Sequence, residues 1–355
     1  MKINGTPYRS IWLGDDGWSV RIFDQRRLPW ELKIVELKTA EQAASAIKEM
    51  WTRGAPLLAM TAAYGLCLGL RENSSDIALD KTYNMLLSTR PTAVNLRWAL
   101  DEMIKAVKPL AGAARIEAAY ARAAALCDED VEINRRIGEY GLTLIKTLAS
   151  KNKGRDINIL THCNAGWLAT VDYGTATSPV YMAHDEGIPV HVWVDETRPR
   201  NQGFLTAYEL SQHGVPHTVI ADNAGGLLMR QGKVDMCIVG ADRVTRNGDV
   251  ANKIGTYLKA LAAQDNNVPF YVALPYTTFD DTLESGDDIS IEERDAEEMK
   301  TVQGLDNYEE LISVKLTTSQ AANPAFDITP AHLVSGYITD RGVVGNIRDL
   351  YKFAA

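Results

Sequence analysis

The 355-residue chain is poor in cysteine and has fewer basic than acidic residues. Its four cysteines form no CxxC pair, which disfavours a zinc knuckle or a thioredoxin motif and predicts free thiols in a reducing compartment. The formal net charge of −9 argues against a nucleic-acid partner, because phosphate backbones select basic surfaces. No apolar run approaches the ~20 residues that span a bilayer, and no apolar signal segment opens the chain. We therefore expect a cytoplasmic protein that binds neither nucleic acid nor membrane.

Two further signatures are missing. No GxGxxG motif follows a predicted strand, so a nucleotide-binding dehydrogenase is disfavoured. The six histidines lack the spacing of metal ligands and need no metal to explain them. The composition is otherwise ordinary: 46% of the residues are hydrophobic, which is ample for globular cores, and the length favours two domains over one.

The spacing of apolar residues along the chain changes near residue 150, and this change predicts the domain organisation. Before it, a short strand-bearing start leads into helical patterns, which lie after Thr39, from Leu57, and over about 77–89, 96–107, 111–126 and 130–149. After it, short apolar strands at 157–161, 189–194, 218–221, 236–239 and 270–274 alternate with helical segments, which we predict around 178–186, 203–213, 223–231 and 253–264. Such alternation is typical of βαβ units in a doubly wound parallel sheet. We predict an α/β fold, with a mainly helical N-terminal domain over residues 1–150 and a Rossmann-like C-terminal domain over 151–355.

Cys163 and Asp242 are the candidate catalytic residues. Each follows a predicted strand of the sheet within a few residues, and ligands of such sheets bind outside the carboxyl ends of the strands. The plainer alternatives are a small buried hydrophobe for the cysteine, as we expect for Cys67 and Cys237, and a helix cap for the aspartate. Two titratable groups that face one pocket can divide the roles of acid and base.

Groups suited to a phosphate recur at the ends of predicted elements. Arginine binds phosphate through two parallel hydrogen bonds, glycine lets the backbone approach a ligand, and glutamine can bind sugar hydroxyls. Each residue alone is better explained as a surface charge or a cap, and their joint occurrence indicates a phosphorylated small molecule. The residues are Arg53, Gly54, Ala55, Arg90, Gln202, Asn252 and Lys253.

Nine segments along nearly the whole chain resemble, in order, those of the 5-methylthioribose-1-phosphate isomerases. That family is related to the regulatory subunits of the guanine-nucleotide exchange factor of eukaryotic translation initiation. The segments are Asp24-Gln25-Arg26, RGAP at 53–56, RPTAVNL at 90–96, THCNAG at 161–166, DETRPRNQG at 195–203, IADN at 220–223, VGADRVTRNGDVANKIGTY at 239–257, IEERD at 291–295 and NPAFDITP at 323–330.

The resemblance implies an intramolecular oxidoreductase that converts 5-methylthioribose 1-phosphate to 5-methylthioribulose 1-phosphate in methionine salvage, without a cofactor or a metal. It assigns catalysis to Cys163 and Asp242. It assigns substrate binding to Arg53, Gly54, Ala55, Arg90, Gln202, Asn252 and Lys253. It also implies a cytoplasmic homodimer of a helical domain and a Rossmann-like domain.

Two alternatives remain open within this resemblance. Leu57–Met60 and the run after THCNAG, which begins at Trp167, are bulkier than is usual in the family. Bulk near the active-site turn would reshape the pocket for the 5-substituent, which keeps 5-deoxyribose 1-phosphate as an alternative substrate. The other alternative is a non-catalytic, sugar-phosphate-sensing regulatory subunit, and the retention of both Cys163 and Asp242 argues against it.

Overall fold

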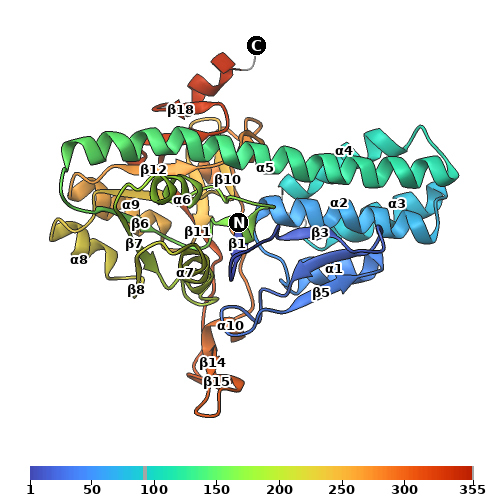
Figure 1. The fold of residues 1–355 in the computed structure, drawn as a ribbon, viewed down its shortest axis with the longest axis horizontal. Helices are drawn as coiled ribbons and strands as arrows, with labels where there is room; N and C mark the ends of the chain where they lie inside the picture. Colours follow the sequence, from blue (N-terminus) through green and yellow to red (C-terminus); the bar gives the residue numbers. More distant parts are fainter. Residues whose placement is uncertain (91–93, 354–355) are drawn as a thin grey trace. The chain divides into compact units, whose positions relative to one another are not determined.

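The computed structural model describes residues 1–90 and 94–353. The chain divides into two compact units: unit 1 is residues 1–135 with 166–174, and unit 2 is residues 136–165 with the chain from 175 onward (Figure 1). Residues 91–93, within the RPTAVNL match, lie outside the described residues. The sequence-based domain division at residue 150 stays a prediction.

Unit 1 combines small antiparallel sheets with helices. Its strands are β1 (Lys2–Ile3), β2 (Thr6–Pro7), β3 (Ile11–Leu13), β4 (Val20–Phe23) and β5 (Ile34–Leu37), and its first helices are α1 (Ala40–Lys48), α2 (Ala55–Glu72), α3 (Asp76–Ser88) and α4 (Val94–Val107). Thr39 and Gln42 cap α1 reciprocally, as the helix-start pattern predicts. The apolar α2 is buried along nearly its whole length and forms the centre of the unit's core.

A single 40-residue helix, α5 (Gly112–Lys151), replaces the two helices predicted over 111–126 and 130–149. The predicted break was wrong because the intervening Cys127-Asp128-Glu129 contains neither glycine nor proline. Asp128 and Glu129 are exposed there, so the charged pair continues the helix without burying charge. The helix runs from unit 1 into unit 2.

Unit 2 is built on a seven-stranded sheet with the order β18-β17-β12-β9-β6-β7-β8. The strands are β6 (Ile157–Thr161), β7 (Val190–Asp195), β8 (His217–Ile220), β9 (Met236–Val239), β12 (Phe270–Ala273), β17 (Gly336–Thr339) and β18 (Gly342–Val344). All neighbours are parallel except the β17–β18 pair. Numbered along the chain, the six parallel strands lie in the order 3-2-1-4-5-6, which is the doubly wound Rossmann arrangement. The predicted α/β fold is confirmed.

The helices of unit 2 largely follow their predicted ranges, with one exception. They are α6 (Ser178–Asp185), α7 (Gln202–His213), α8 (Gly225–Arg230), α9 (Thr256–Asp265) and the short α10 (Glu297–Lys300). A helix was predicted from Lys253, but Lys253 ends strand β11 (Val250–Lys253), which forms a hairpin with β10 (Arg243–Thr245). The cause is long-range pairing: β11 also pairs with β16 (Phe326–Thr329), more than seventy residues along the chain.

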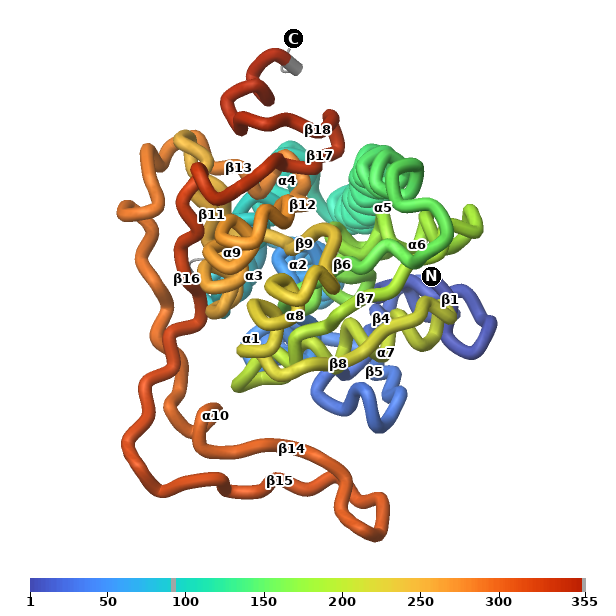
Figure 2. The backbone as a smooth tube through the Cα atoms, turned by 90° about the vertical axis from the view of Figure 1, so that its left-hand side faces the viewer, coloured from blue at the N-terminus to red at the C-terminus, as the bar shows by residue number. Residues whose placement is uncertain are grey.

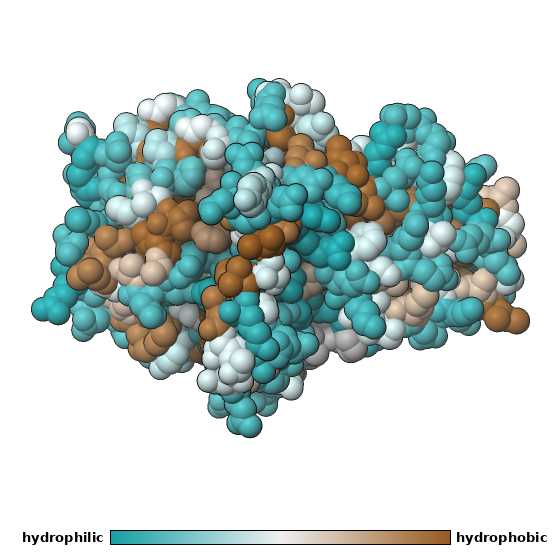
Figure 3. All heavy atoms as spheres, turned by 90° about the horizontal axis from the view of Figure 1, so that it is seen from below, coloured by the Kyte–Doolittle hydropathy of each residue, from teal (hydrophilic) through white to brown (hydrophobic). Residues whose placement is uncertain are grey.

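The region from Phe279 to Lys315 contains strands as well as exposed loops. It includes β13 (Phe279–Asp280), β14 (Thr301–Leu305) and β15 (Leu311–Lys315), and the last two form a separate hairpin that Figure 2 shows in orange and red. Short 3₁₀ turns lie at Trp167–Ala169, Tyr276–Thr278, Gly286–Asp288, Ala331–Leu333 and Ile347–Phe353. Hydrophilic residues cover most of the face in Figure 3, with smaller apolar patches between them. Over residues 1–90 and 94–353, every helix is too short or too polar to cross a bilayer.

Candidate active site

The two predicted catalytic residues leave neighbouring strands at the same edge of the unit 2 sheet. β6 and β9 are parallel neighbours, with Leu160 opposite Cys237. Cys163 lies two residues beyond the end of β6, and Asp242 lies three residues beyond the end of β9. The strand order reverses between β6 and β9, and this switch point is where open α/β sheets bind their ligands. The fold therefore brings both residues to the crevice that such a sheet offers.

The loops that carry Cys163 and Asp242 are in contact. A Cβ atom built on Gly240 would lie 2.7 Å from the Cβ of Ala165 and 3.6 Å from the Thr175 hydroxyl. Only glycine fits at this position without a shift of one loop. The Asp242 amide donates to the Ala251 carbonyl at 2.9 Å, which fixes the aspartate at the start of the β10–β11 hairpin.

Cys163 is held in an uncommon backbone conformation. Its φ is +67°, a region that side-chain-bearing residues adopt at a cost of about 1–3 kcal/mol. Its amide donates to the Thr197 hydroxyl at 2.9 Å, and its carbonyl accepts from the Thr206 hydroxyl at 2.9 Å. Thr197 is itself left-handed, with φ +62°. Such conformations persist where the surroundings over-determine them, and they concentrate at functional sites.

The cysteines fall into two groups. Cys67, Cys127 and Cys237 are buried, and burial raises the pKa of each thiol, which suits the packing role predicted for Cys67 and Cys237. Cys163 is partly exposed. It is therefore the cysteine of this chain that a ligand at the switch point can reach.

The predicted binding residues of unit 2 lie around the same edge. Gln202 begins α7, just beyond the end of β7, and its buried Oε1 has no hydrogen-bond partner among the residues that the structure describes. Asn252 is buried in β11, where its amide donates to the Thr256 hydroxyl at 3.0 Å. The next residue, Lys253, places its ammonium 4.5 Å from the centre of the Phe326 ring.

The predicted binding residues of unit 1 gather at the start of α2, with Arg90 after α3. Arg53 is buried and donates from Nη2 to the Gln25 carbonyl at 2.9 Å. Gly54 has φ +93°, and a Cβ atom there would lie 2.3 Å from the Ala169 carbonyl oxygen, so the position requires glycine. Gly54 is the N-cap of the 18-residue helix α2, and the free amides at a helix start favour anions.

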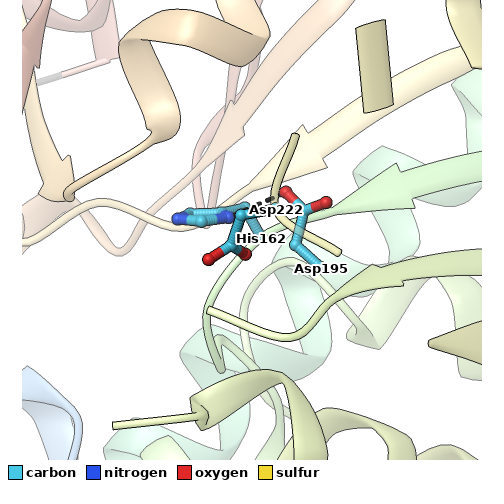
Figure 4. Close-up of side chains that lie close together, drawn as sticks. All are labelled: His162, Asp195 and Asp222. Carbon is cyan, nitrogen blue, oxygen red and sulfur yellow. Dashed lines mark hydrogen bonds and ion pairs between the residues drawn. The ribbon is translucent and has the colours of Figure 1, made fainter. Parts of the chain in front are cut away.

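A buried charged network includes His162, the residue that precedes Cys163. Asp195 Oδ2 is 2.8 Å from His162 Nδ1 and 3.1 Å from Lys259 Nζ, and the three side chains are almost inaccessible to solvent. Lys259 also donates to the Asp222 carbonyl. Figure 4 shows the His162 ring and the Asp195 and Asp222 carboxylates converging. Sequence reasoning missed this network, although a histidine beside the candidate cysteine and an aspartate at the end of the next strand were its visible signals.

His162, Asp195 and Asp222 are also the group of described residues whose side chains could hold a metal ion, with ligand atoms within 4.8 Å of one another. The Lys259 ammonium already lies against Asp195 Oδ2. Its positive charge balances the carboxylate that a metal would otherwise neutralise. The donor set is therefore satisfied by the protein's own cation.

Comparisons with known proteins agree with this geometry. The model of the Initiation factor 2 subunit family matches residues 51–346. A methylthioribose-1-phosphate isomerase from Acidiphilium cryptum (strain JF-5) is 62% identical over 348 residues, covering 97% of this chain and 94% of the relative. The crystal structure of 5-methylthioribose 1-phosphate isomerase from Pyrococcus horikoshii OT3 matches with a TM-score of 0.83 at 40% identity, covering 98% of this chain and 96% of that one. The translation initiation factor eIF-2B, subunit delta, from A. fulgidus matches with a TM-score of 0.80 at 38% identity, covering 97% and 98%.

Proposed function

The chain belongs to the initiation factor 2 subunit family, and from that premise we propose that it is an aldose–ketose isomerase that converts 5-methylthioribose 1-phosphate to 5-methylthioribulose 1-phosphate in methionine salvage. Relatives that cover nearly the whole chain at up to 62% identity bear this isomerase name. The observation that carries the proposal is the contact between the Cys163 and Asp242 loops at the β6–β9 switch point, where Gly240 meets Ala165.

The reaction needs a dedicated acid because the substrate cannot open its ring in the ordinary way. An aldose opens by losing the proton of its anomeric hydroxyl, and in a 1-phosphate that oxygen carries the phosphoryl group instead. The enzyme must therefore break the bond between C1 and the ring oxygen directly. We assign this protonation to Asp242, which starts as the carboxylic acid and gives its proton to the departing ring oxygen.

We assign the transfer of hydrogen between carbons to Cys163. Its thiolate removes the C2 proton, the C2–H electrons form a C1–C2 double bond, and the C1–oxygen bond breaks as Asp242 protonates the ring oxygen. The product of this step is an enol phosphate. The thiol then returns the proton to C1, and the C2 hydroxyl gives its proton to the Asp242 carboxylate as the ketone forms. Both residues end in their starting states, so the cycle needs no redox cofactor.

A hydride shift from C2 to C1 is the rival route, and an isotope experiment distinguishes the two. If Cys163 exchanges its proton with water during the lifetime of the enol, turnover in D₂O places deuterium at C1 of the product. Its complete absence would count against Cys163 as an exchanging base. The same measurement on the 5-deoxy substrate tests whether both sugars follow one route.

We assign substrate binding to residues whose side chains and amides suit phosphate and hydroxyl groups. In unit 1 we assign the phosphate to Arg53, Gly54, Ala55 and Arg90, because arginine and helix-start amides favour anions. In unit 2 we assign hydroxyl and phosphate contacts to Gln202, Asn252 and Lys253. The buried, unpartnered Oε1 of Gln202 supports this role, because a buried acceptor without a donor costs free energy until a ligand supplies one.

We also propose, from the family resemblance, that the protein acts as a homodimer in the cytoplasm. Its partner molecule is then a small sugar phosphate rather than a nucleic acid or a membrane, in keeping with the net charge of −9. Sedimentation across a concentration series tests the dimer, and a monomer at micromolar concentration would contradict it.

Product analysis with two substrates in parallel tests the function. The purified protein is incubated separately with 5-methylthioribose 1-phosphate and 5-deoxyribose 1-phosphate, and ketose 1-phosphate formation is followed by NMR. We expect turnover of the methylthio sugar. The bulk of Leu57–Met60 was the reason to consider the 5-deoxy sugar as an alternative substrate. These residues are buried in the core of unit 1, where they serve packing.

The ratio of the two kcat/KM values identifies the preferred sugar, since one sulfur atom in an apolar pocket is worth only about 1–3 kcal/mol. A higher value for the 5-deoxy sugar would establish the sister activity. A protein inert toward both that still gains thermal stability with either sugar would favour the regulatory alternative.

A further inference from the structure

The His162 ring lies between two hydrogen-bond acceptors. Its Nε2 is 2.8 Å from the Ile254 carbonyl oxygen, which can only accept, so Nε2 must carry a hydrogen. Its Nδ1 is 2.8 Å from Asp195 Oδ2. The same Oδ2 is 3.1 Å from the Lys259 ammonium, which identifies Asp195 as an ionised acceptor. Both ring nitrogens are therefore donors, and a histidine with two N–H groups is a cation.

We propose that His162 is a doubly protonated imidazolium that positions Cys163, the next residue in the chain, and supplies a positive charge adjacent to it. The role of the cysteine in this inference rests on the proposed function, while the charge state of His162 does not. A neighbouring cation favours the thiolate over the thiol, and the thiolate is the form that removes a proton in the isomerisation.

The network also ties together the elements that carry the site. His162 directly follows β6, and Asp195 ends β7. Lys259 belongs to α9 and donates to the carbonyl of Asp222, which lies beyond β8. The Ile254 carbonyl directly follows Lys253, so the imidazole fixes the cysteine loop against the strand that holds Asn252 and Lys253. A Cβ atom on Gly255 would lie 3.0 Å from the ring, so the turn packs closely over it.

The charges around the ring are consistent with a cation. The Asp222 carboxylate accepts from the amides of Thr197 and Arg198 at 2.7 and 2.8 Å. On β16, burial raises the pKa of Asp327, and the amides of Gly255 and Tyr257 and the charges of His162 and Lys259 lower it. On β9, burial raises the pKa of Cys237, so it remains a neutral thiol. The surrounding acids are therefore Asp195, Asp222 and Asp327, opposed by His162 and Lys259.

Asp195→Asn is the informative variant because asparagine keeps the shape of the aspartate side chain and should change the protonation of the His162 ring. Asparagine lacks the carboxylate charge that faces Nδ1 and the Lys259 ammonium, so the doubly protonated His162 loses its counter-ion while Nε2 still donates to the Ile254 carbonyl. We expect kcat to fall about 10- to 100-fold with KM within about threefold, since the substrate contacts remain. We also expect the pH dependence of Cys163 alkylation by iodoacetamide to move to higher pH.

The chain offers a matched control in a second histidine–aspartate pair. His213 Nε2 lies 2.8 Å from Asp185 Oδ1 on the helices α7 and α6, away from the strand ends, and the Asp185 side chain is 64% exposed. Asp185→Asn should leave kcat and the alkylation curve unchanged. Comparison with the Cys163→Ser variant separates alkylation of Cys163 from alkylation of the three buried thiols.

NMR of the ¹⁵N-histidine-labelled wild-type protein reads the charge directly, with His162→Gln to assign the signals. Two ring N–H groups on His162 at pH 7.5 are expected, and a single one would overturn the proposal even if Asp195→Asn fails to fold. An unchanged kcat and alkylation curve in a folded Asp195→Asn protein would overturn the positioning role. A doubly protonated His162 in a wild-type protein that turns over neither sugar would refute the proposed function and leave the charge assignment standing.

Discussion

Cys163 shares its residue type with three buried thiols, and its surroundings set it apart. The buried cysteines lie in apolar cores, where burial raises their pKa values and keeps them inert. Cys163 follows a strand at the switch point, has a left-handed backbone and adjoins a charged histidine network. The reactivity that we propose for Cys163 therefore follows from its position in the fold and not from its residue type.

We predict that Cys163→Ser lowers kcat for the sugar phosphate by about 10²–10⁴-fold, because a hydroxyl is a much weaker base than a thiolate. KM and the unfolding midpoint should change little, since Thr197 and Thr206 hold the backbone of this residue, which serine keeps. Steady-state kinetics with circular dichroism as the control provide the measurement. Near-normal turnover by the serine variant would remove Cys163 from the mechanism.

At the residue scale, the sequence was sufficient to predict which strand ends carry polar side chains. Cys163 and Asp242 each lie just beyond a strand that the apolar pattern predicts, and Gln202 begins the helix that follows another such strand. The role of His162 could not be predicted, because its partners Asp195 and Ile254 lie 33 and 92 residues away along the chain. A local pattern contains no information about such a pairing.

Among the elements, the contact between the β6 and β9 loops is the one on which the proposed mechanism depends. We predict that Gly240→Ala lowers kcat about 10- to 100-fold, because the added methyl group would meet the Ala165 Cβ at 2.7 Å and push the Asp242 loop away. A misplacement of about 1 Å can cost this much. Kinetics of the folded variant give the measurement.

The same clash supplies its own control. Removing the opposing methyl group in the double variant Gly240→Ala/Ala165→Gly should restore most of the lost activity, since the clash is between these two Cβ atoms. Ala165→Gly alone should have a smaller effect than Gly240→Ala. Failure of the double variant to recover would mean that Gly240 serves another purpose than the close approach of the loops.

The start of α2 depends on a second close approach. We predict that Gly54→Ala destabilises the protein by about 2–4 kcal/mol and raises KM, because it combines φ +93° with a Cβ atom 2.3 Å from the Ala169 carbonyl oxygen. Gly17→Ala is the matched control in the same unit, with φ +75° but open space around the added atom. It should cost only about 1 kcal/mol. Equal unfolding midpoints in urea for the two variants would refute the steric argument.

The elements that the sequence did not reveal are those that need distant partners. Apolar runs long enough to be recognised became β6, β7, β9 and β12. The hairpin of β10 and β11 is short and largely polar, and it is stabilised by pairing with β13 and β16. The NGD turn at 247–249 was recognisable, but nothing local indicated that its flanks would form strands.

For the whole molecule, the alternation of strands and helices was enough to predict a doubly wound sheet but not its order. The order 3-2-1-4-5-6 decides that β6 and β9 are neighbours, and this neighbourhood brings Cys163 and Asp242 to the same edge of the sheet. Many α/β folds share the same alternation, so the resemblance to a family supplied what the pattern could not.

Stability of the molecule should depend on pH through one buried carboxyl group. Burial raises the pKa of Asp130 to about 7, with a smaller contribution from Asp172, while the Val171 amide and the Asn134 side chain lower it. An ordinary aspartate titrates near 3.9 in an unfolded chain. The native state therefore binds more protons than the unfolded state, so this group's stabilisation is complete below about pH 4 and is lost as the pH rises to about 7.

We predict that the free energy of unfolding of Asp130→Asn, relative to the wild type, is roughly 2–3 kcal/mol higher at pH 8 than at pH 5. Asparagine can still accept from the Val171 amide, but it never ionises. Urea unfolding at the two pH values measures the difference. Asp128→Asn is the control on the same helix: its carboxylate is 67% exposed and pairs with Arg9 at the surface, so the pH dependence should match that of the wild type. An Asp130→Asn protein whose stability relative to the wild type is the same at both pH values would mean that this carboxyl ionises as freely in the folded protein as in the unfolded chain. The loss of stability above pH 5 would then have to come from groups elsewhere in the molecule.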